Sequence, residues 1–121
     1  MGTFAVTLEA GNQAGDMYRT VEALVDTGAT STVLPGSVLR DLGVAAHRTS
    51  LFELADGSRH EWQMGRTWVR LQGKQEMTLV VFGEEDAKPL LGAVTLEEFL
   101  LAPDPVRKTL VPVPGLLMTL L

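Results

Sequence analysis

The stretch from Val25 to Pro35 reads VDTGATSTVLP, and it decides how the rest of the chain is interpreted. It places an Asp-Thr-Gly turn, beginning at Asp26, between two runs of residues that favour β-strands. A connecting loop does not require a lone carboxylate at such a turn. We therefore interpret Asp26 as one half of a catalytic carboxylate pair. Because the same residues are ordinary turn formers, the alternative is a turn aspartate without chemistry.

Length and composition indicate one globular domain. The 121 residues are 45% apolar and 21% charged, which suits a single modest core and leaves no room for a second lobe. We therefore expect one domain over residues 1–121, and a site that needs two similar lobes has to be built by two chains. The net charge of −5 comes without a basic cluster, which argues against a nucleic-acid-binding surface.

Composition also bears on location and cofactors. No apolar run reaches membrane-spanning length and no secretory leader opens the chain, so a cytoplasmic protein is expected. Cysteine is absent, which excludes disulfides, thiol catalysis and zinc-thiolate sites. His47 and His60 are isolated, with no spacing that suggests a metal site, so no metal is expected.

Periodicity predicts a mostly-β chain in which strands enter and leave the Asp-Thr-Gly turn. The expected strands cover 3–8, 17–25, 31–34, 49–55, 58–64, 66–71, 76–82, 89–92 and 108–113. Asp56-Gly57 favours a tight hairpin because both residues tolerate positive φ, and a second hairpin is expected around Gly73. The strand over 76–82 is apolar on both faces, so it should lie inside the sheet.

Two short helices complete the expected architecture. Residues 36–43 have apolar side chains at helical spacing and end at Gly43, which is expected to form the C-terminal cap. The second helix is expected within 93–100, with Thr95 and Glu98 forming a capping box. Short strands, two brief helices and glycine-marked turns indicate a mostly-β, barrel-like domain.

Three segments resemble, in order and spacing, those of retropepsin-like aspartic proteases. The stretch 25–35 resembles the active-site turn, the hairpin at about 49–64 resembles the flap, and PLLGAVTLEEF within 89–100 resembles the hydrophobic-hydrophobic-Gly strand with its helix. The likeness extends from Phe4 to Phe99. It implies a single-domain closed β-barrel that acts as a homodimer.

The resemblance implies an aspartic endopeptidase without cofactors, in which Asp26 from two copies activates a water that attacks a peptide bond. Thr27 would hydrogen-bond across the two-fold axis, and Gly28 would let the substrate backbone approach. Ala29 occupies the place where pepsin-type lobes usually have a Ser or Thr that donates to the carboxylate. Without that donor, we expect a mildly acidic to near-neutral pH optimum.

The resemblance also assigns residues around the turn. The hairpin tip at Asp56 and Gly57 would fold over bound peptide as a flap, and Thr30 and Trp62 are candidates for the substrate pocket. Two plainer interpretations stay open. Asp56-Gly57 is a good hairpin turn in any β protein, and an aromatic residue such as Trp62 often serves packing alone.

The expected dimer interface departs from the viral pattern. Many viral members carry an Asp and an Arg that pair near the interface, whereas this chain has Thr30 and Ala93 there. The N-terminal strand extension is nearly absent, while the apolar segment 108–121 is longer. Leu116 to Leu121 is therefore expected to pair with its symmetry mate as an edge strand. The alternative is that this segment covers its own barrel.

Three functions remain open from sequence. The leading one is a homodimeric aspartic endopeptidase that acts on peptide or protein substrates. The second is a catalytically silent retropepsin-like module that holds extended peptides or only dimerises. The third is a structural β-barrel in which the Asp-Thr-Gly turn is coincidental.

Overall fold

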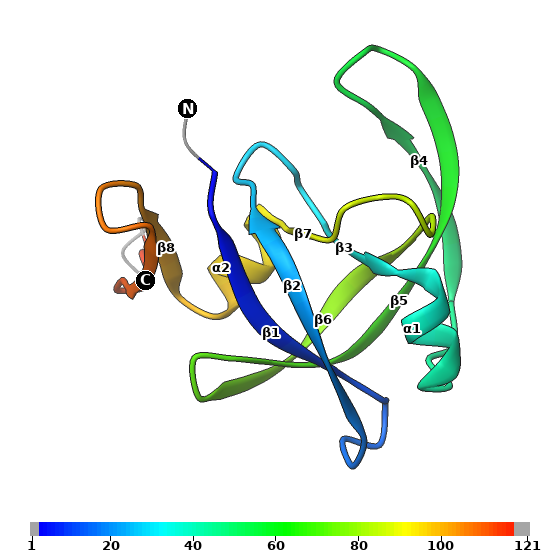
Figure 1. The fold of residues 1–121 in the computed structure, drawn as a ribbon, viewed down its shortest axis with the longest axis horizontal. Helices are drawn as coiled ribbons and strands as arrows, with labels where there is room; N and C mark the ends of the chain where they lie inside the picture. Colours follow the sequence, from blue (N-terminus) through cyan, green and yellow to red (C-terminus); the bar gives the residue numbers. More distant parts are fainter. Residues whose placement is uncertain (1–2, 118–121) are drawn as a thin grey trace.

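The computed structural model describes residues 3–117, which form strands around a common core and two short helices (Figure 1). The strands are β1 Ala5–Gly11, β2 Tyr18–Val25, β3 Thr32–Pro35, β4 Arg48–Glu53, β5 Arg59–Leu71, β6 Lys74–Gly83, β7 Leu90–Leu91, β8 Leu101–Asp104 and β9 Thr109–Pro112. The helices are α1 Gly36–Asp41 and α2 Ala93–Glu98. The prediction of a mostly-β chain with two brief helices is confirmed.

Seven strands form one sheet in the order β1-β2-β7-β3-β6-β5-β4. The sheet closes into a ring because β1 also pairs with β5, through Glu9 with Arg70 and Ala10 with Val69. Strand β4 lies outside this ring and pairs only with β5. The predicted interior position of the strand over 76–82 is confirmed, since β6 lies between β3 and β5.

Apolar side chains fill the inside of the ring. The most deeply buried large side chains come from different strands and from α2, and they include Leu8, Leu34, Val69, Val80, Leu91 and Phe99. Alternating residues of β1 and β2 point into this core, as the period of two predicted. Burial of these apolar side chains provides the main favourable free energy of folding, and it holds the loops at the sheet edges in place.

Helix α1 ends as its sequence predicts. Gly43 has φ +73°, a left-handed conformation that glycine adopts without a steric penalty. Its N–H donates to the carbonyl of Arg40, and the N–H of Val44 donates to that of Leu39, both at 2.9 Å. These two bonds form a Schellman motif, so the C-terminal carbonyls of α1 are satisfied.

The β4–β5 hairpin differs from the tight two-residue turn predicted at Asp56-Gly57. Its loop runs over Leu54 to Ser58, and the Gly57 N–H donates to the Leu54 carbonyl at 2.9 Å. Gly57 has φ +85°, but Asp56 does not have positive φ. The reason is local: the Asp56 carboxylate accepts the Ser58 N–H at 2.9 Å, which forms an Asx turn in place of a type I′ turn.

The predicted strands at 58–64 and 66–71 are one continuous strand, β5. Gly65 does not break it, although glycine suggested a boundary. A Cβ at this position would lie 2.6 Å from the Ala45 carbonyl oxygen, so the strand uses glycine to let a neighbouring loop approach. The hairpin around Gly73 is confirmed, and Gln72 and Gly73, with φ of 51° and 75°, both adopt the left-handed conformation of a tight turn.

The capping box predicted at Thr95 and Glu98 is wrong. Helix α2 begins earlier, with Gly92 as its N-cap residue and no side chain capping it. Thr95 is instead buried within the helix, where its hydroxyl contacts other threonines. The spacing of Thr95 and Glu98 fits a capping box, but here both residues form hydrogen bonds to Thr78 on β6.

After α2 the chain forms a separate two-stranded sheet of β8 and β9. The strand predicted at 108–113 is present as β9, but it pairs with β8, which the sequence did not predict, and not with the core sheet. Leu116 and Leu117 follow it, 75% and 89% exposed, outside any strand. The rest of the predicted edge strand, 118–121, lies outside the described residues.

Candidate active site

Asp26 begins a loop that joins β2 to β3 and covers residues 26–31, called here the Asp26 loop. In Figure 1 this loop lies at the top of the ring, between the β4–β5 hairpin and the β8–β9 sheet. The Asp26 N–H donates to the Leu91 carbonyl at 3.0 Å, and the Ala29 N–H donates back to the Asp26 carbonyl at 3.1 Å. The backbone of the turn is thus attached to the core strand β7.

The carboxylate of Asp26 is half-buried and bonded to its own turn. Its Oδ1 accepts the Gly28 N–H at 3.0 Å. A Cβ on residue 28 would lie 3.2 Å from the same oxygen, so glycine leaves the carboxylate uncrowded. A backbone donor on one carboxylate oxygen orients the group and leaves the other oxygen free for a further partner.

The residues around Gly92 clamp the Asp26 loop from below. The Ala93 N–H donates to the Ala29 carbonyl at 2.8 Å, and the Val94 N–H donates to the Thr30 carbonyl at 3.0 Å. A Cβ at Gly92 would lie 2.6 Å from the Ser31 carbonyl oxygen, so only glycine permits this approach. The PLLG segment and the Asp-Thr-Gly turn therefore form one unit, although they are far apart in the sequence.

Buried hydroxyls connect this unit to the sheet. The Gly92 N–H donates to Thr32 Oγ1 at 3.0 Å, and Thr32 Oγ1 donates to Thr95 Oγ1 at 2.6 Å. Thr95 Oγ1 lies 3.0 Å from Thr78 Oγ1, whose hydrogen goes to the Glu98 carboxylate. Because that hydrogen is used, Thr95 donates to Thr78, and the whole chain of bonds runs in one direction to a carboxylate.

Sequence reasoning missed this threonine chain. All three threonines are fully buried, and threonines on strands are ordinarily interpreted as neutral β-formers. The only signal of this chain in the sequence would have been Thr32, shortly after the Asp-Thr-Gly turn, and Thr95 in α2. Only their contact across 63 positions of sequence separation reveals the role.

Two clefts open on either side of the Asp26 loop. One, of about 430 Å³, is lined by Asp26, Thr27 and Gly28 together with Phe4 and Pro103 among others. The loop thus exposes the carboxylate to a mostly apolar hollow next to the β8–β9 sheet. Thr27 itself is exposed, so its side chain is free for a partner outside this chain.

The second cleft, of about 440 Å³, lies between the Asp26 loop and the β4–β5 hairpin. Gly28, Ala29 and Thr30 line one side of it, and Trp62 lines the other. The structure therefore brings the two pocket candidates, Thr30 and Trp62, to the same cleft. Apolar residues of β4 and its loop, including Leu51, complete the wall.

Trp62 has a defined position in this wall. Its ring stacks on His60, with centroids 5.4 Å apart, and lies against Phe52 at 5.9 Å. Its indole Nε1 donates to Glu84 Oε1 at 3.3 Å. Trp62 therefore links the β4–β5 hairpin to the loop between β6 and β7.

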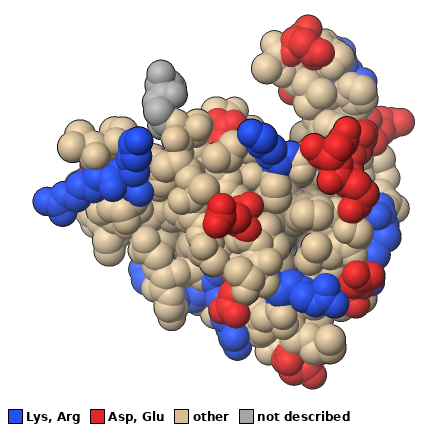
Figure 2. Space-filling model, viewed as in Figure 1, with Lys and Arg blue, Asp and Glu red and all other residues tan. Residues whose placement is uncertain are grey.

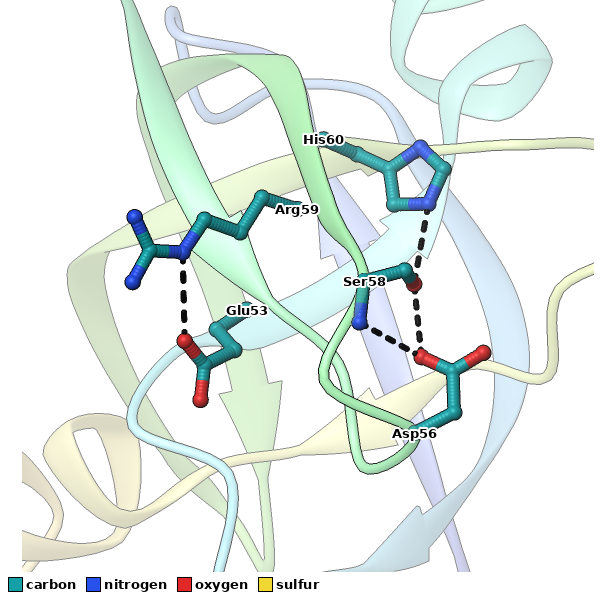
Figure 3. A network of polar contacts seen from close by, with 5 residues as sticks. All are labelled: Glu53, Asp56, Ser58, Arg59 and His60. Carbon is teal, nitrogen blue, oxygen red and sulfur yellow. Dashed lines mark hydrogen bonds and ion pairs between the residues drawn. The ribbon is translucent and has the colours of Figure 1, made fainter.

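The hairpin tip stands apart from the Asp26 loop. In Figure 1 it rises above the ring and bends over toward the side where the Asp26 loop lies. Figure 3 shows that Asp56 Oδ1 accepts hydrogen bonds from the Ser58 hydroxyl at 2.6 Å and from the Ser58 N–H at 2.9 Å. The hydroxyl bond and then the backbone bond hold the pKa of the Asp56 carboxyl below its ordinary value.

Asp, Ser and His meet at this tip without forming a nucleophilic site. Ser58 Oγ lies between Asp56 Oδ1 and His60 Nε2, which is 3.2 Å away (Figure 3). Its hydrogen is donated to Asp56, so His60 does not take it as a general base. The bonds instead stiffen the turn, as does the Arg59–Glu53 ion pair across the hairpin at 3.2 Å.

Within residues 3–117 no three His, Asp or Glu side chains are grouped so that they could hold a metal ion. Neither helix of that same range has the length and apolar character of a membrane span.

Comparison with known families identifies the family of the chain. Residues 17–98 match the family described as "gag-polyprotein putative aspartyl protease". The match covers the Asp26 loop, the β4–β5 hairpin and α2. The chain belongs to this gag-polyprotein aspartyl protease family.

Solved structures support the same fold. The chain is similar to the EIAV protease in complex with the inhibitor HBY-793, with a TM-score of 0.58 and 17% sequence identity. The similarity covers 81% of this chain and 88% of the viral chain. The fold expected from the sequence resemblance is thereby confirmed as retropepsin-like. No curated protein sequence matches the chain.

Proposed function

We propose that the protein is an aspartic endopeptidase whose active site is completed by a second copy of the chain. The observation that carries this proposal is the position of Asp26. Its half-buried carboxylate is oriented by the Gly28 N–H and lines a cleft, on a loop that is bonded to the core and has a second cleft on its other side. Family membership and the retropepsin-like fold support the same assignment.

In the proposed reaction, the Asp26 carboxylates of two copies share one proton and hold a water between them. One carboxylate accepts a proton from the water as it attacks the peptide carbonyl, and the other supplies a proton to the leaving amine. The repulsion of like charges keeps one proton in the pair. No cofactor is needed for this step.

Exposed apolar residues support a second copy beside the Asp26 cleft. Val106 is 89% exposed, and Leu116 and Leu117 are exposed to a similar extent. Pro103 and Pro105, which come just before Val106, line the cleft that holds Asp26. A partner that covers these residues would bury apolar surface and bring its own loop toward Asp26.

The decisive test is peptide-library cleavage by the wild type and by Asp26→Asn, with Asp41→Asn as the matched control. Asp41 is an exposed carboxylate of α1 in a 4.0 Å surface contact with Arg19. Asp26→Asn should lower kcat by about 10³-fold or more, since it removes the general acid and base. Asp41→Asn should cleave normally.

Dilution tests the requirement for two copies. Specific activity should fall as the protein is diluted below the dimer Kd, because a single chain holds half of the site. Mixing wild type with excess Asp26→Asn should also reduce activity by forming mixed dimers. Equal cleavage by wild type and Asp26→Asn would rule out the mechanism, whereas tight peptide binding without cleavage by either would favour a peptide-binding module.

A further inference from the structure

We propose that the apolar groove beside Trp62 is a specificity subsite for a basic side chain, lysine or arginine, of the substrate peptide. The inference rests on the proposed function, because it names a feature of the substrate for that site. It concerns the groove between the β4–β5 hairpin and the loop that joins β6 to β7, called here the Trp62 groove.

The Trp62 groove shares part of its wall with the cleft beside the Asp26 loop. It has a volume of about 420 Å³, and its lining is formed mostly by apolar atoms. Val33, Leu54, Trp62 and Leu90 line both this groove and the cleft that contains Gly28. A peptide lying in the cleft could therefore place one side chain in the groove.

Carboxylates surround the apolar wall. Glu84 and Asp86 line the groove together with Lys88 and His60, so two carboxylates outnumber the one ammonium group. In Figure 2 acidic side chains gather just below the protruding hairpin, over the part of the molecule where the β6–β7 loop lies. The charge of the rim therefore favours a cationic ligand.

The two carboxylates are available to a ligand. Neither Glu84 nor Asp86 forms an ion pair within the described range of 3–117. Glu84 Oε1 accepts the Trp62 indole N–H, which leaves its Oε2 for another donor. Neighbouring Glu85 is different, because the Ser37 hydroxyl and N–H occupy its oxygens at 2.6 and 3.0 Å.

This combination selects the kind of side chain. Lysine and arginine carry an apolar stem with a charged end, so the stem can pack on Trp62 and Leu90 while the end reaches the carboxylates. A leucine would use only the apolar wall. An acidic residue would be repelled by Glu84 and Asp86.

The test compares peptides that differ by one charge. A set of octapeptides carries lysine at one of the eight positions in turn, and its partner set carries norleucine, which keeps the stem and lacks the ammonium group. At one position the wild type should prefer lysine about 5- to 10-fold in kcat/KM, the size expected for contacts with two exposed carboxylates. The preference should shrink in high salt.

The variant Glu84→Gln with Asp86→Asn should remove this preference while it still cleaves the norleucine peptides. Glutamine keeps an acceptor for the Trp62 indole, so the groove should hold its shape. Glu76→Gln is the matched control, because Glu76 is an exposed carboxylate near the opposite end of β6. It should leave the lysine preference unchanged.

Binding separates the two proposals. The lysine and norleucine peptides are titrated by calorimetry into Asp26→Asn protein, with and without the Glu84→Gln and Asp86→Asn changes. Tighter binding of a lysine peptide that depends on these carboxylates would support the groove even if no peptide is cleaved. Equal affinity for both peptide sets, or a lysine preference that survives the double change, would overturn it.

Discussion

Thr32 on β3 and Thr95 in α2 donate and accept one buried hydrogen bond of 2.6 Å, and this bond joins the two segments that hold the Asp26 loop. The same Thr32 hydroxyl accepts the N–H of Gly92, the residue that approaches the Ser31 backbone. One hydroxyl therefore connects β3, which follows the Asp26 loop, to α2, whose first residues are hydrogen-bonded to the loop. Its position makes it a sensitive point for both stability and activity.

Thr32→Val should reduce the free energy of unfolding by about 2 kcal/mol, because it leaves the buried Gly92 N–H without its acceptor and removes the bond that the Thr95 hydroxyl accepts. Valine has nearly the same shape, so the loss reports hydrogen bonding and not volume. Urea unfolding measures it. Thr20→Val is the control, since Thr20 is an exposed residue of β2 and should change stability by less than about 0.5 kcal/mol.

Gly28→Ala should lower kcat/KM while it leaves the unfolding transition almost unchanged. The added methyl would lie 3.2 Å from Asp26 Oδ1, and residue 28 lines both clefts beside the loop. Because position 28 is exposed, no core packing is lost. Gly115→Ala is the control, where the methyl would meet only the Leu100 side chain at 3.4 Å. Full activity of Gly28→Ala would show that close approach to the carboxylate is unnecessary.

Gly43→Ala should cost about 1 kcal/mol of stability. Residue 43 has φ +73°, and an added Cβ would meet no atom within 4 Å, so the cost comes from the left-handed backbone alone. Thermal unfolding of the variant against the wild type measures it. Gly43→Asn should recover part of the loss, because asparagine tolerates this conformation better than alanine. An alanine variant as stable as the wild type would contradict the role of the cap.

The turn at the hairpin tip should weaken in acid. The Asp56 carboxyl has a lowered pKa because the Ser58 hydroxyl and N–H bind its ionised form. A lowered folded-state pKa means that the turn is stabilised above the ordinary carboxyl pKa, and this stabilisation is lost as the pH falls through the lowered value. Carbon-detected NMR titration of Asp56 checks the direction. Ser58→Ala should raise the Asp56 pKa toward its ordinary value, and an unshifted titration would contradict the assignment.

Much of the fold followed from local patterns. The hairpin at Gly73, the cap at Gly43 and the interior position of β6 were predictable because each depends on residues adjacent in sequence. A φ requirement or an alternation of apolar residues leaves a local signal. A sequence pattern that fits two different local structures gave a wrong prediction. Thr95 and Glu98 have the spacing of a capping box, yet they belong to the buried threonine chain.

The candidate site was likewise predictable only in part. The Asp-Thr-Gly turn and the PLLG segment were recognisable as motifs, and they predicted a site around Asp26. The hydrogen bonds that join these two segments were not predictable. The bonds from Ala93 to Ala29 and from Gly92 to Thr32 form only after the ring closes. The position of Glu84 beside Trp62 likewise depends on a contact between separate strands.

By itself, the sequence determined that this chain is mostly β, that glycine shapes its turns, and that one carboxylate stands at a polar turn between strands. These properties depend on backbone sterics and on the alternation of apolar side chains, which act over a few residues. Only the tertiary structure decided which hydroxyls hold the Asp26 loop and which clefts the loop faces. It also decided that Trp62 of the β4–β5 hairpin contacts the acidic loop between β6 and β7. Such contacts join residues that are distant in sequence, so packing of the closed ring is what brings them together.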